Sequence, residues 1–172
     1  MTAPEIKAEL DLDRRDKAEI ADLLARAFAG AFAAEFPGGY YHRHPHHMRI
    51  LARRDGRIVG HMALTLRGIG IDGIHHPFVG IADVAVAPEA QGRGIGRGLT
   101  AAARDWMAGT GFDLALLFGT SGLYRHAGFC PVTNPIIWDK PPPDGRHDLM
   151  ARWRGGRIWD QRAEIRYFGD MF

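Results

Sequence analysis

The sequence predicts an α/β domain (of the mixed α+β kind) with a mostly antiparallel sheet that contains a central parallel pair of strands, and with helices on both faces. Three observations lead to this fold class. Strand-like segments between residues 48 and 86 are separated by Asp55-Gly56 and Asp72-Gly73, which are strong turn signals. A glycine-rich turn and a helical pattern follow the last of these segments. The apolar run Leu114–Phe118 then resembles a strand buried on both faces, which is typical of parallel pairing.

Length and composition favour a single domain over residues 1–172. The chain is long enough to bury a core, and 46% of its residues are hydrophobic. The net charge is +2 with acidic and basic residues interspersed, so we expect no nucleic-acid partner. The single cysteine, Cys130, excludes an internal disulfide and favours a cytoplasmic location. No apolar segment is long enough to span a bilayer and no secretory signal is recognised, so we expect no membrane partner.

The N-terminal part is predicted to contain a strand and a helix. Ile6–Leu12 alternates weakly between apolar and polar residues, which indicates a strand. Asp13 is a suitable N-cap, and apolar residues then recur at helical spacing until the pattern fades near Gly30. Residues 31–36 are expected to form a short helical piece or a loop, which ends at Pro37-Gly38-Gly39.

A histidine-rich segment, residues 42–47, comes next. Four of its six residues are histidines, but Pro45 interrupts any helical pair of ligands, and no cysteine or acidic residue completes a ligand set. We therefore predict no metal site and interpret the segment as a polar and aromatic loop.

Seven later segments have the composition of strands. They are Met48–Arg53, Arg57–Ile71, Phe78–Val86, Leu114–Phe118, Ile136–Trp138, Asp148–Trp153 and Arg157–Trp159. The first three are expected to form an antiparallel meander, and Pro88, which cannot donate to a sheet ladder, ends the third. A helix over Ile95–Met107 joins the third strand to the fourth, which supports a local parallel pair with a right-handed crossover. The tail through Tyr167 is aromatic enough to pack.

The turn after the third strand is predicted to bind a pyrophosphate. Its residues are Gln91, Gly92, Arg93, Gly94, Ile95, Gly96 and Arg97. The first N–H groups of a helix have no partner inside the helix, and the helix dipole adds about half a positive charge there. The three glycines remove Cβ atoms that would keep an anion away, and the two arginines add formal charge.

Two better-known phosphate loops do not fit this turn. A Walker loop ends in Gly-Lys-Ser or Gly-Lys-Thr, and the dinucleotide fingerprint has the spacing G-x-G-x-x-G after a first strand. The chain has neither pattern here, so a nucleotide-binding α/β domain is the least favoured alternative.

Two motifs at this spacing resemble the GNAT superfamily of acetyl-CoA-dependent N-acyltransferases. Gln91-x-x-Gly94-x-Gly96, preceded by Val-Ala-Val-x-Pro, is similar to GNAT motif A. Tyr124-x-x-x-Gly128-Phe129 is similar to the end of motif B, although the usual Asn and Ala of its longer form are missing. The resemblance implies the GNAT fold, in which a strand splays from its parallel neighbour at a bulge.

The resemblance also implies how acetyl-CoA would be held. The backbone of Val84, Ala85 and Val86 would pair with the pantetheine arm, and one N–H would act as an oxyanion donor, which is commonly worth about 3 kcal/mol. The pyrophosphate would bind the turn from Gln91 to Arg97. No metal is expected, and the acetyl group would pass directly to the amine in a ternary complex.

Tyr124 is the candidate acid, because its position matches the family motif. A thiol has a pKa of about 8.5 and tyrosine one of about 10, so protonating the leaving thiolate costs only about 2 kcal/mol. The alternative is that Tyr124 only packs under its helix. Asp83 is the candidate base, with a structural carboxylate as an equal alternative; His61, His126 and a water chain are further candidates for this step.

The acceptor is expected to be a small primary amine. In the GNAT pattern the segment after the first helix borders the acceptor site, so Phe36, Tyr40 and Tyr41 are candidate substrate-binding residues. Ala27–Gly30 and Leu149–Gly156 resemble the aminoglycoside 2′-N-acetyltransferases, whereas Gly60–Met62 and Phe118–Thr120 resemble the nodulation N-acyltransferases. A basic, histidine-rich loop argues against a polycationic aminoglycoside.

Two alternatives of another kind stay open at this point. The same fold could serve as a non-catalytic CoA-binding or regulatory module, and the chain could form a homodimer.

Overall fold

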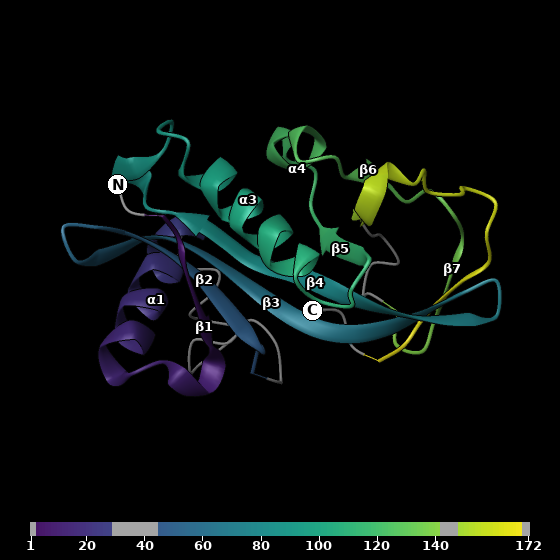
Figure 1. The fold of residues 1–172 in the computed structure, drawn as a ribbon, viewed down its shortest axis with the longest axis horizontal. Helices are drawn as coiled ribbons and strands as arrows, with labels where there is room; N and C mark the ends of the chain where they lie inside the picture. The colour runs from purple at the N-terminus through teal and green to yellow at the C-terminus, as the bar shows by residue number, and fades with distance from the viewer. Residues whose placement is uncertain (1–2, 29–44, 142–147, 170–172) are drawn as a thin grey trace. The chain divides into compact units, whose positions relative to one another are not determined.

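The computed structural model describes residues 3–28, 45–141 and 148–169 (Figure 1). Its elements follow the order of the chain. They are β1 (Glu5–Ala8), the 3-10 helix η1 (Glu9–Asp11), α1 (Arg14–Ala27), β2 (Met48–Arg54), β3 (Arg57–Ile71), β4 (Ile74–Val86), η2 (Pro88–Ala90), α3 (Ile95–Ala108), β5 (Leu114–Phe118), α4 (Gly122–His126), β6 (Cys130–Pro131), β7 (Ile136–Trp138), β8 (Leu149–Trp153), η3 (Arg154–Gly156) and β9 (Ile165–Tyr167).

The strands form a mixed sheet with the hydrogen-bonding order β1-β2-β3-β4-β5-β8-β6. Antiparallel pairs join β1 to β2, β2 to β3, and β5 to β8, and β4 pairs with β5 in parallel. At one edge of the order β6 pairs with β8, and off the main path β9 pairs with β3 and, in parallel, with the short β7. A mostly antiparallel sheet with a parallel β4–β5 pair confirms the predicted fold class.

The chain forms two compact units. Unit 1 consists of residues 1–65 and 82–106, and unit 2 consists of residues 66–81 and 107–172. The long strands β3 and β4 supply residues to both units. Unit 1 holds α1, the N-terminal strands and most of α3, whereas unit 2 holds α4 and strands β5 to β9.

Helix α1 of unit 1 begins at the predicted N-cap. Asp13 Oδ1 accepts a hydrogen bond of 2.7 Å from the backbone N–H of Asp16, which satisfies one of the free donors of the first turn. The helix buries Ile20, Leu23 and Leu24. These apolar side chains recur at helical spacing, which is the pattern of a helix that packs one face against a sheet.

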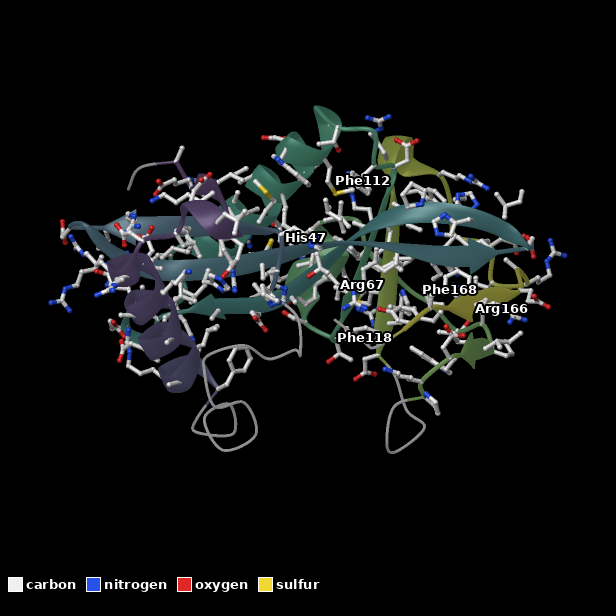
Figure 2. All side chains as sticks on the ribbon, turned by 90° about the horizontal axis from the view of Figure 1, so that it is seen from below. His47, Arg67, Phe112, Phe118, Arg166 and Phe168 are labelled. Atoms are coloured by element: carbon white, nitrogen blue, oxygen red, sulfur yellow. The ribbon has the colours of Figure 1, made fainter. Side chains whose placement is uncertain are left out.

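Helix α3 packs closely on the other side of the strands. A Cβ atom added to Gly60 of β3 would lie 2.5 Å from Ile95 Cγ2 and 3.4 Å from Leu99 Cδ1, so the absence of a side chain lets α3 approach. Figure 2 shows α1 and α3 on opposite sides of the strand ribbons of unit 1. This arrangement confirms the prediction of helices on both faces.

Strand β5 of unit 2 is buried over its first four residues, as its continuous apolar sequence predicts, and Phe118 is half-buried. Its residues Leu114, Ala115, Leu116 and Leu117 are all at most 1% exposed. An aromatic cluster forms in the same unit around Tyr167 of β9. The ring centroid of Tyr167 lies 4.9 Å from that of Trp138 and about 6 Å from those of Phe78 and Phe118.

Several boundaries predicted from the sequence were wrong. The strand expected over Ile6–Leu12 ends at Ala8, because Glu9–Asp11 turns into a 3-10 helix and buries Glu9. The strand expected over Arg157–Trp159 does not form. Gly155 and Gly156 turn the chain with φ values of 74° and 76°, and Trp159 packs through its side chain, donating from Nε1 to Asn134 Oδ1.

A smaller difference concerns β4, which begins at Ile74 and not at Phe78, because the strand includes the polar residues 75–77. Cys130 is half-buried, and its Sγ donates to the carbonyl oxygen of Ala151 over 3.4 Å. No helix in the described part of the chain is long and apolar enough to cross a lipid bilayer.

Candidate active site

The turn between β4 and α3 in unit 1 has the backbone that its glycines predict. Gly92 and Gly94 adopt φ values of 72° and 79°, in the left-handed region that other residues rarely occupy. A Cβ atom at either position would meet no described atom within 4 Å. These glycines are therefore needed for the backbone conformation and not for space, and the turn is open to solvent.

The start of α3 presents free backbone donors at this turn. The N–H of Gly98 bonds to the carbonyl oxygen of Gly94 over 3.0 Å. The N–H groups of residues 95–97 precede that bond and have no acceptor within the helix. Arg93 and Arg97 are exposed beside them, while the side chain of Ile95 is buried in the core. Of these residues Ile95 can offer an anion only its backbone.

Gln91 ties the turn to the end of β4. Its Nε2 donates to the carbonyl oxygen of Val86 over 3.2 Å. The side chain therefore holds the turn against the strand, and this leaves the backbone N–H groups and the two arginines as the groups able to meet a phosphate.

The end of β4 is irregular, and its register with β5 stops early. The pairs run from Phe78 opposite Leu114 to Ile81 opposite Leu117, whereas β4 continues to Val86. Asp83 has a φ of 50°, which is unusual for a residue with a side chain and marks a local bulge. Beyond the bulge, Val84 and Val86 are half-buried and Ala85 is buried.

Asp83 does not face solvent. Its carboxylate is 2% exposed, and its Oδ2 lies 2.9 Å from His46 Nε2. Its backbone carbonyl oxygen accepts a hydrogen bond of 2.8 Å from His61 Nδ1. His46 Nδ1 lies in turn 2.8 Å from Thr65 Oγ1. The contacts with His46 and His61 therefore hold the bulge through both the side chain and the backbone of Asp83.

Two charged residues that sequence reasoning missed complete this buried network. Arg49 Nε donates to Glu9 Oε2 over 2.6 Å, and Arg49 Nη1 contacts His61 Nε2 at 3.1 Å. Burial and the neighbouring Arg49 charge lower the pKa of His61 to about 3, so its ring is neutral. The available signal was that Arg49 shares one face of β2 with the apolar residue Leu51, because side chains two positions apart in a strand point the same way.

Tyr124 lies in α4 of unit 2, between a side-chain cap and a glycine stop. Ser121 Oγ accepts from the N–H of Leu123 at the start of the helix, and Gly128 ends the segment with a φ of 87°. The Tyr124 ring contacts Phe129 in a T-shaped arrangement at 6.3 Å. Burial raises the pKa of Tyr124, and within the described ranges no residue forms a hydrogen bond with its hydroxyl. The phenol therefore stays protonated.

The remaining candidates divide into two groups. Phe36, Tyr40 and Tyr41, like most of the histidine-rich segment, lie outside the described residues. His126 is exposed and donates from Nδ1 to the carbonyl oxygen of Gly122 over 2.7 Å. In the part of the chain that the structure describes, no cluster of three or more His, Cys, Asp or Glu side chains is arranged to hold a metal ion.

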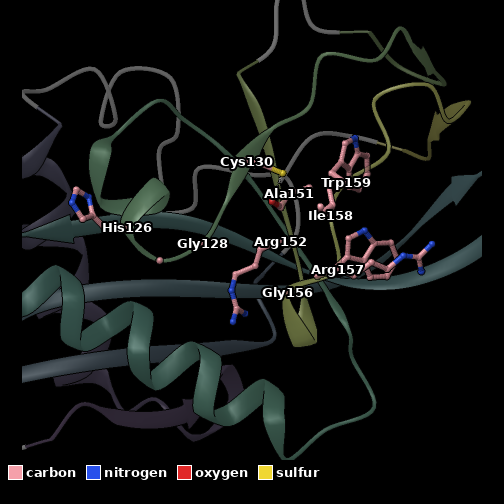
Figure 3. A pocket seen from close by; sticks show the side chains of 11 residues that line it. His126, Gly128, Cys130, Ala151, Arg152, Gly156, Arg157, Ile158 and Trp159 are labelled. Carbon is pink, nitrogen blue, oxygen red and sulfur yellow. Dashed lines mark hydrogen bonds between the residues drawn. The ribbon is translucent and has the colours of Figure 1, made fainter.

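Unit 2 also contains a cavity of about 430 Å³ (Figure 3). Trp153 and Trp159 form part of its wall, and the Arg157 guanidinium lies 4.6 Å from the centre of the Trp153 ring. Its lining residues include His126, Arg152 and Arg157 but, among the described residues, no acidic side chain. The sequence did not reveal it, because residues 126–130 and 151–159 meet only in the folded chain.

One protein family and several solved structures are similar to this chain. The acetyltransferase (GNAT) domain family matches residues 11–132. A GNAT family acetyltransferase from Brucella melitensis, solved in complex with acetyl-CoA, is similar with 21% identity over 96% of both chains and a TM-score of 0.59. A GNAT family N-acetyltransferase from Escherichia coli, solved in complex with CoA, has 17% identity, 98% and 91% coverage, and a TM-score of 0.63.

A longer protein gives a partial match. A probable N-acyltransferase from Enterococcus faecalis has 21% identity over 76% of this chain and a TM-score of 0.61, and the chain covers 33% of its length. No curated protein matches the sequence. At these identities the solved structures establish the fold.

Proposed function

This chain belongs to the GNAT acetyltransferase family, and we propose that it transfers an acetyl group from acetyl-CoA to a primary amine. The proposal depends chiefly on one observation, the left-handed glycine turn that opens α3 and is separated from the bulged strand β4 only by the short η2. In the reaction the amine nitrogen attacks the thioester carbonyl carbon. The C–S bond breaks, the CoA thiolate leaves, and the nitrogen loses one proton.

We assign acetyl-CoA to unit 1 because the turn before α3 is open to solvent and positively charged. The pyrophosphate binds the free N–H groups at the start of α3, with Arg93 and Arg97 beside it, and needs no metal to neutralise it. The pantetheine arm pairs with the backbone of β4 from Val84 to Val86. The early end of the β4–β5 register at Ile81 supports this assignment, because it leaves that stretch of backbone available.

Two groups act on the thioester. A backbone N–H of β4 accepts the developing negative charge on the carbonyl oxygen, as an oxyanion donor does. The match of Tyr124 to the end of motif B supports its hydroxyl as the group that hydrogen-bonds to the leaving sulfur. Because burial raises the pKa of Tyr124, this contact is a hydrogen bond from a protonated phenol, with full proton transfer following only as the thiolate forms. The proton that the amine loses then returns the phenol to its protonated form through water.

We assign the removal of the amine proton to a chain of water molecules. Asp83 was the candidate base, but its carboxylate is buried and bonds to His46, which argues for a role in holding the strand. His61 is not our choice of base, since its ring is fully buried and bonded at both nitrogens, and burial lowers its pKa to about 3. Phe36, Tyr40 and Tyr41 remain the proposed contacts of the amine, and the single cysteine supports a cytoplasmic location.

Isotope-labelled acetyl-CoA and a panel of amines test this function. We expect acetyl-CoA to raise the melting temperature by binding the native state, and label to pass to at least one amine. Tight CoA binding with slow thioester loss in the presence of every amine would instead favour a non-catalytic CoA-binding module. Stabilisation by ATP or NAD but not by CoA would contradict both readings.

A further inference from the structure

We propose that His61 is a positioning residue that aims the Val84 N–H at the thioester oxygen, and that Arg49 and Glu9 hold His61 in place. The inference rests on the proposed function, because it names the β4 donor that acts as the oxyanion hole. It concerns residues that belong to unit 1 and that neither sequence motif contains.

Only one tautomer of His61 fits its two partners. The carbonyl oxygen of Asp83 can only accept, so His61 Nδ1 must carry the hydrogen of their 2.8 Å contact. The Arg49 guanidinium can only donate, so His61 Nε2 must be the acceptor of the 3.1 Å contact. Arg49 is itself fixed by its 2.6 Å bond to Glu9. The direction of the His61 N–H is therefore set by a chain of buried contacts.

The same contact sets the direction of the next peptide group. In a trans peptide the carbonyl of one residue and the N–H of the following residue point in opposite directions. The Asp83 carbonyl points at His61, so the Val84 N–H points away from it. His61 follows Gly60 on β3 and projects from the opposite face, and Gly60 is the residue against which α3 packs. The Val84 N–H therefore points toward the side on which the glycine turn opens α3.

The conformation of Asp83 needs such a restraint. A φ of 50° is unfavourable for a residue with a Cβ atom and persists only where the surroundings hold it. Asp83 is held by the His61 bond to its carbonyl, by the 2.9 Å contact of its carboxylate with His46, and by the Arg49 guanidinium, whose Nη1 lies 3.9 Å from Asp83 Oδ2. Because His61 is fully buried and uses both ring nitrogens, it cannot exchange a proton with substrate, and its effect on the reaction is positional.

Two substitutions of His61 distinguish the effect of its bond to Asp83 from the effect of its contact with Arg49. In His61→Asn the side-chain amide occupies the place of Nδ1 and keeps a donor for Asp83. In His61→Gln the terminal amide occupies the place of Nε2, which keeps a partner for Arg49 but removes the donor to Asp83. We expect His61→Gln to lower kcat by about 10-fold to 100-fold with an almost unchanged KM for acetyl-CoA, and His61→Asn to keep kcat within about 5-fold of the parent.

A spectroscopic readout accompanies the kinetics. In the parent protein the ¹⁵N–¹H shift of Val84 is expected to differ between the complexes with acetyl-CoA and with CoA, because only the former has the carbonyl oxygen. That difference should persist in His61→Asn and shrink in His61→Gln. If His61→Gln keeps both the parent kcat and the parent shift difference, the positioning role is wrong while the acetyltransferase proposal stands. If the parent itself shows neither acetyl transfer nor a shift difference, the proposed function fails.

A measurement on the parent protein covers the case in which a variant does not fold. Long-range ¹H–¹⁵N spectra of the His61 ring report its tautomer directly. We expect the Nδ1–H tautomer, unchanged from pH 6 to pH 9. An Nε2–H tautomer, or a ring that titrates in this range, would overturn the inference.

Discussion

Gly60 and Ile95 meet so closely that the strand and the helix have room for only one side chain between them. An alanine Cβ at position 60 would lie 2.5 Å from Ile95 Cγ2 and 3.2 Å from the Cβ of Ala52. Ile95 is branched, 2% exposed and the first residue of α3, so it cannot turn away. The contact therefore sets the position at which α3 presents its free N–H groups.

Gly60→Ala is predicted to lower the free energy of unfolding by about 1–3 kcal/mol, as overpacking of a core does. It should also weaken acetyl-CoA binding, because it displaces the start of α3. Urea denaturation and calorimetric titration measure the two effects. Gly111→Ala is the matched control, since a Cβ there meets no described atom within 4 Å and should change neither quantity appreciably.

Gly94→Ala is predicted to raise the Kd for acetyl-CoA by about 10-fold, because alanine at a φ of 79° costs about 1–2 kcal/mol and the turn would reorganise to avoid it. Gly98→Ala, one turn further along α3, is the control. Its Cβ would be 3.8 Å from Pro4 Cγ, and alanine favours a helix interior by up to about 1 kcal/mol over glycine. Equal Kd values for the two variants would contradict a binding role for the turn.

Tyr124→Phe is predicted to lower kcat by about 100-fold and to leave the Kd for CoA unchanged, since it removes only the hydroxyl that we propose stabilises the leaving thiolate. Phenylalanine retains the ring contact with Phe129, so the melting temperature should hardly move. Because burial raises the pKa of Tyr124, any loss of rate from its ionisation should begin at a higher pH than for a free tyrosine. A variant with the parent kcat would remove Tyr124 from the mechanism.

The buried carboxylate of Asp16 leads us to expect that the free energy of unfolding depends on pH. Burial acts to raise the pKa of Asp16, but hydrogen bonds from Lys7 and Arg53 outweigh it and hold the pKa below the usual 3.8. A carboxylate with a lowered pKa stabilises the folded state above its unfolded pKa, and that stability is lost as the pH falls through the folded value. Asp16→Asn should therefore cost about 2 kcal/mol at pH 7 and much less near pH 2.

Chemical denaturation at the two pH values measures this difference. Asp22→Asn is a suitable control on the same helix, because its exposed pair with Arg26 is worth little. A stability difference between the parent and Asp16→Asn that stays constant from pH 7 to pH 2 would show that the carboxylate charge is not what stabilises the fold.

Local patterns predicted most of the fold. The run Leu114–Phe118 and the segment Arg57–Ile71 became strands with the expected bounds, and Asp13 caps α1. These features depend on hydrophobic periodicity and turn chemistry, which act over a few residues. The last strand, Ile165–Tyr167, was missed because it pairs with β3 and β7, far away in the chain, and carries a charged residue in its middle.

The candidate site was likewise predictable only where its residues are contiguous in the sequence. The turn from Gln91 to Arg97 is contiguous, so its glycines and arginines were visible in the sequence. The network around Asp83 was not, because Glu9, Arg49 and His61 come from three separate segments and are ordinary residues in isolation. Their partnership depends on strand register, in which Arg49 lies opposite Ala63 and Leu51 opposite His61. Register of this kind requires the assembled sheet.

The Glu9–Arg49–His61 contacts have a consequence for the start of the chain. Glu9 follows β1, so detachment of this four-residue strand would withdraw the acceptor that restrains Arg49 and, through it, the imidazole. The glycine turn is anchored to the end of β4 by the Gln91 bond to Val86, so it should keep its conformation when β1 frays, although Pro4 would move away from Gly98 in the first turn of α3. A protein with a loosened N-terminal strand should therefore still retain coenzyme A while losing the ability to pass on its acyl group, so that ligand retention alone would overstate how much competent enzyme is present.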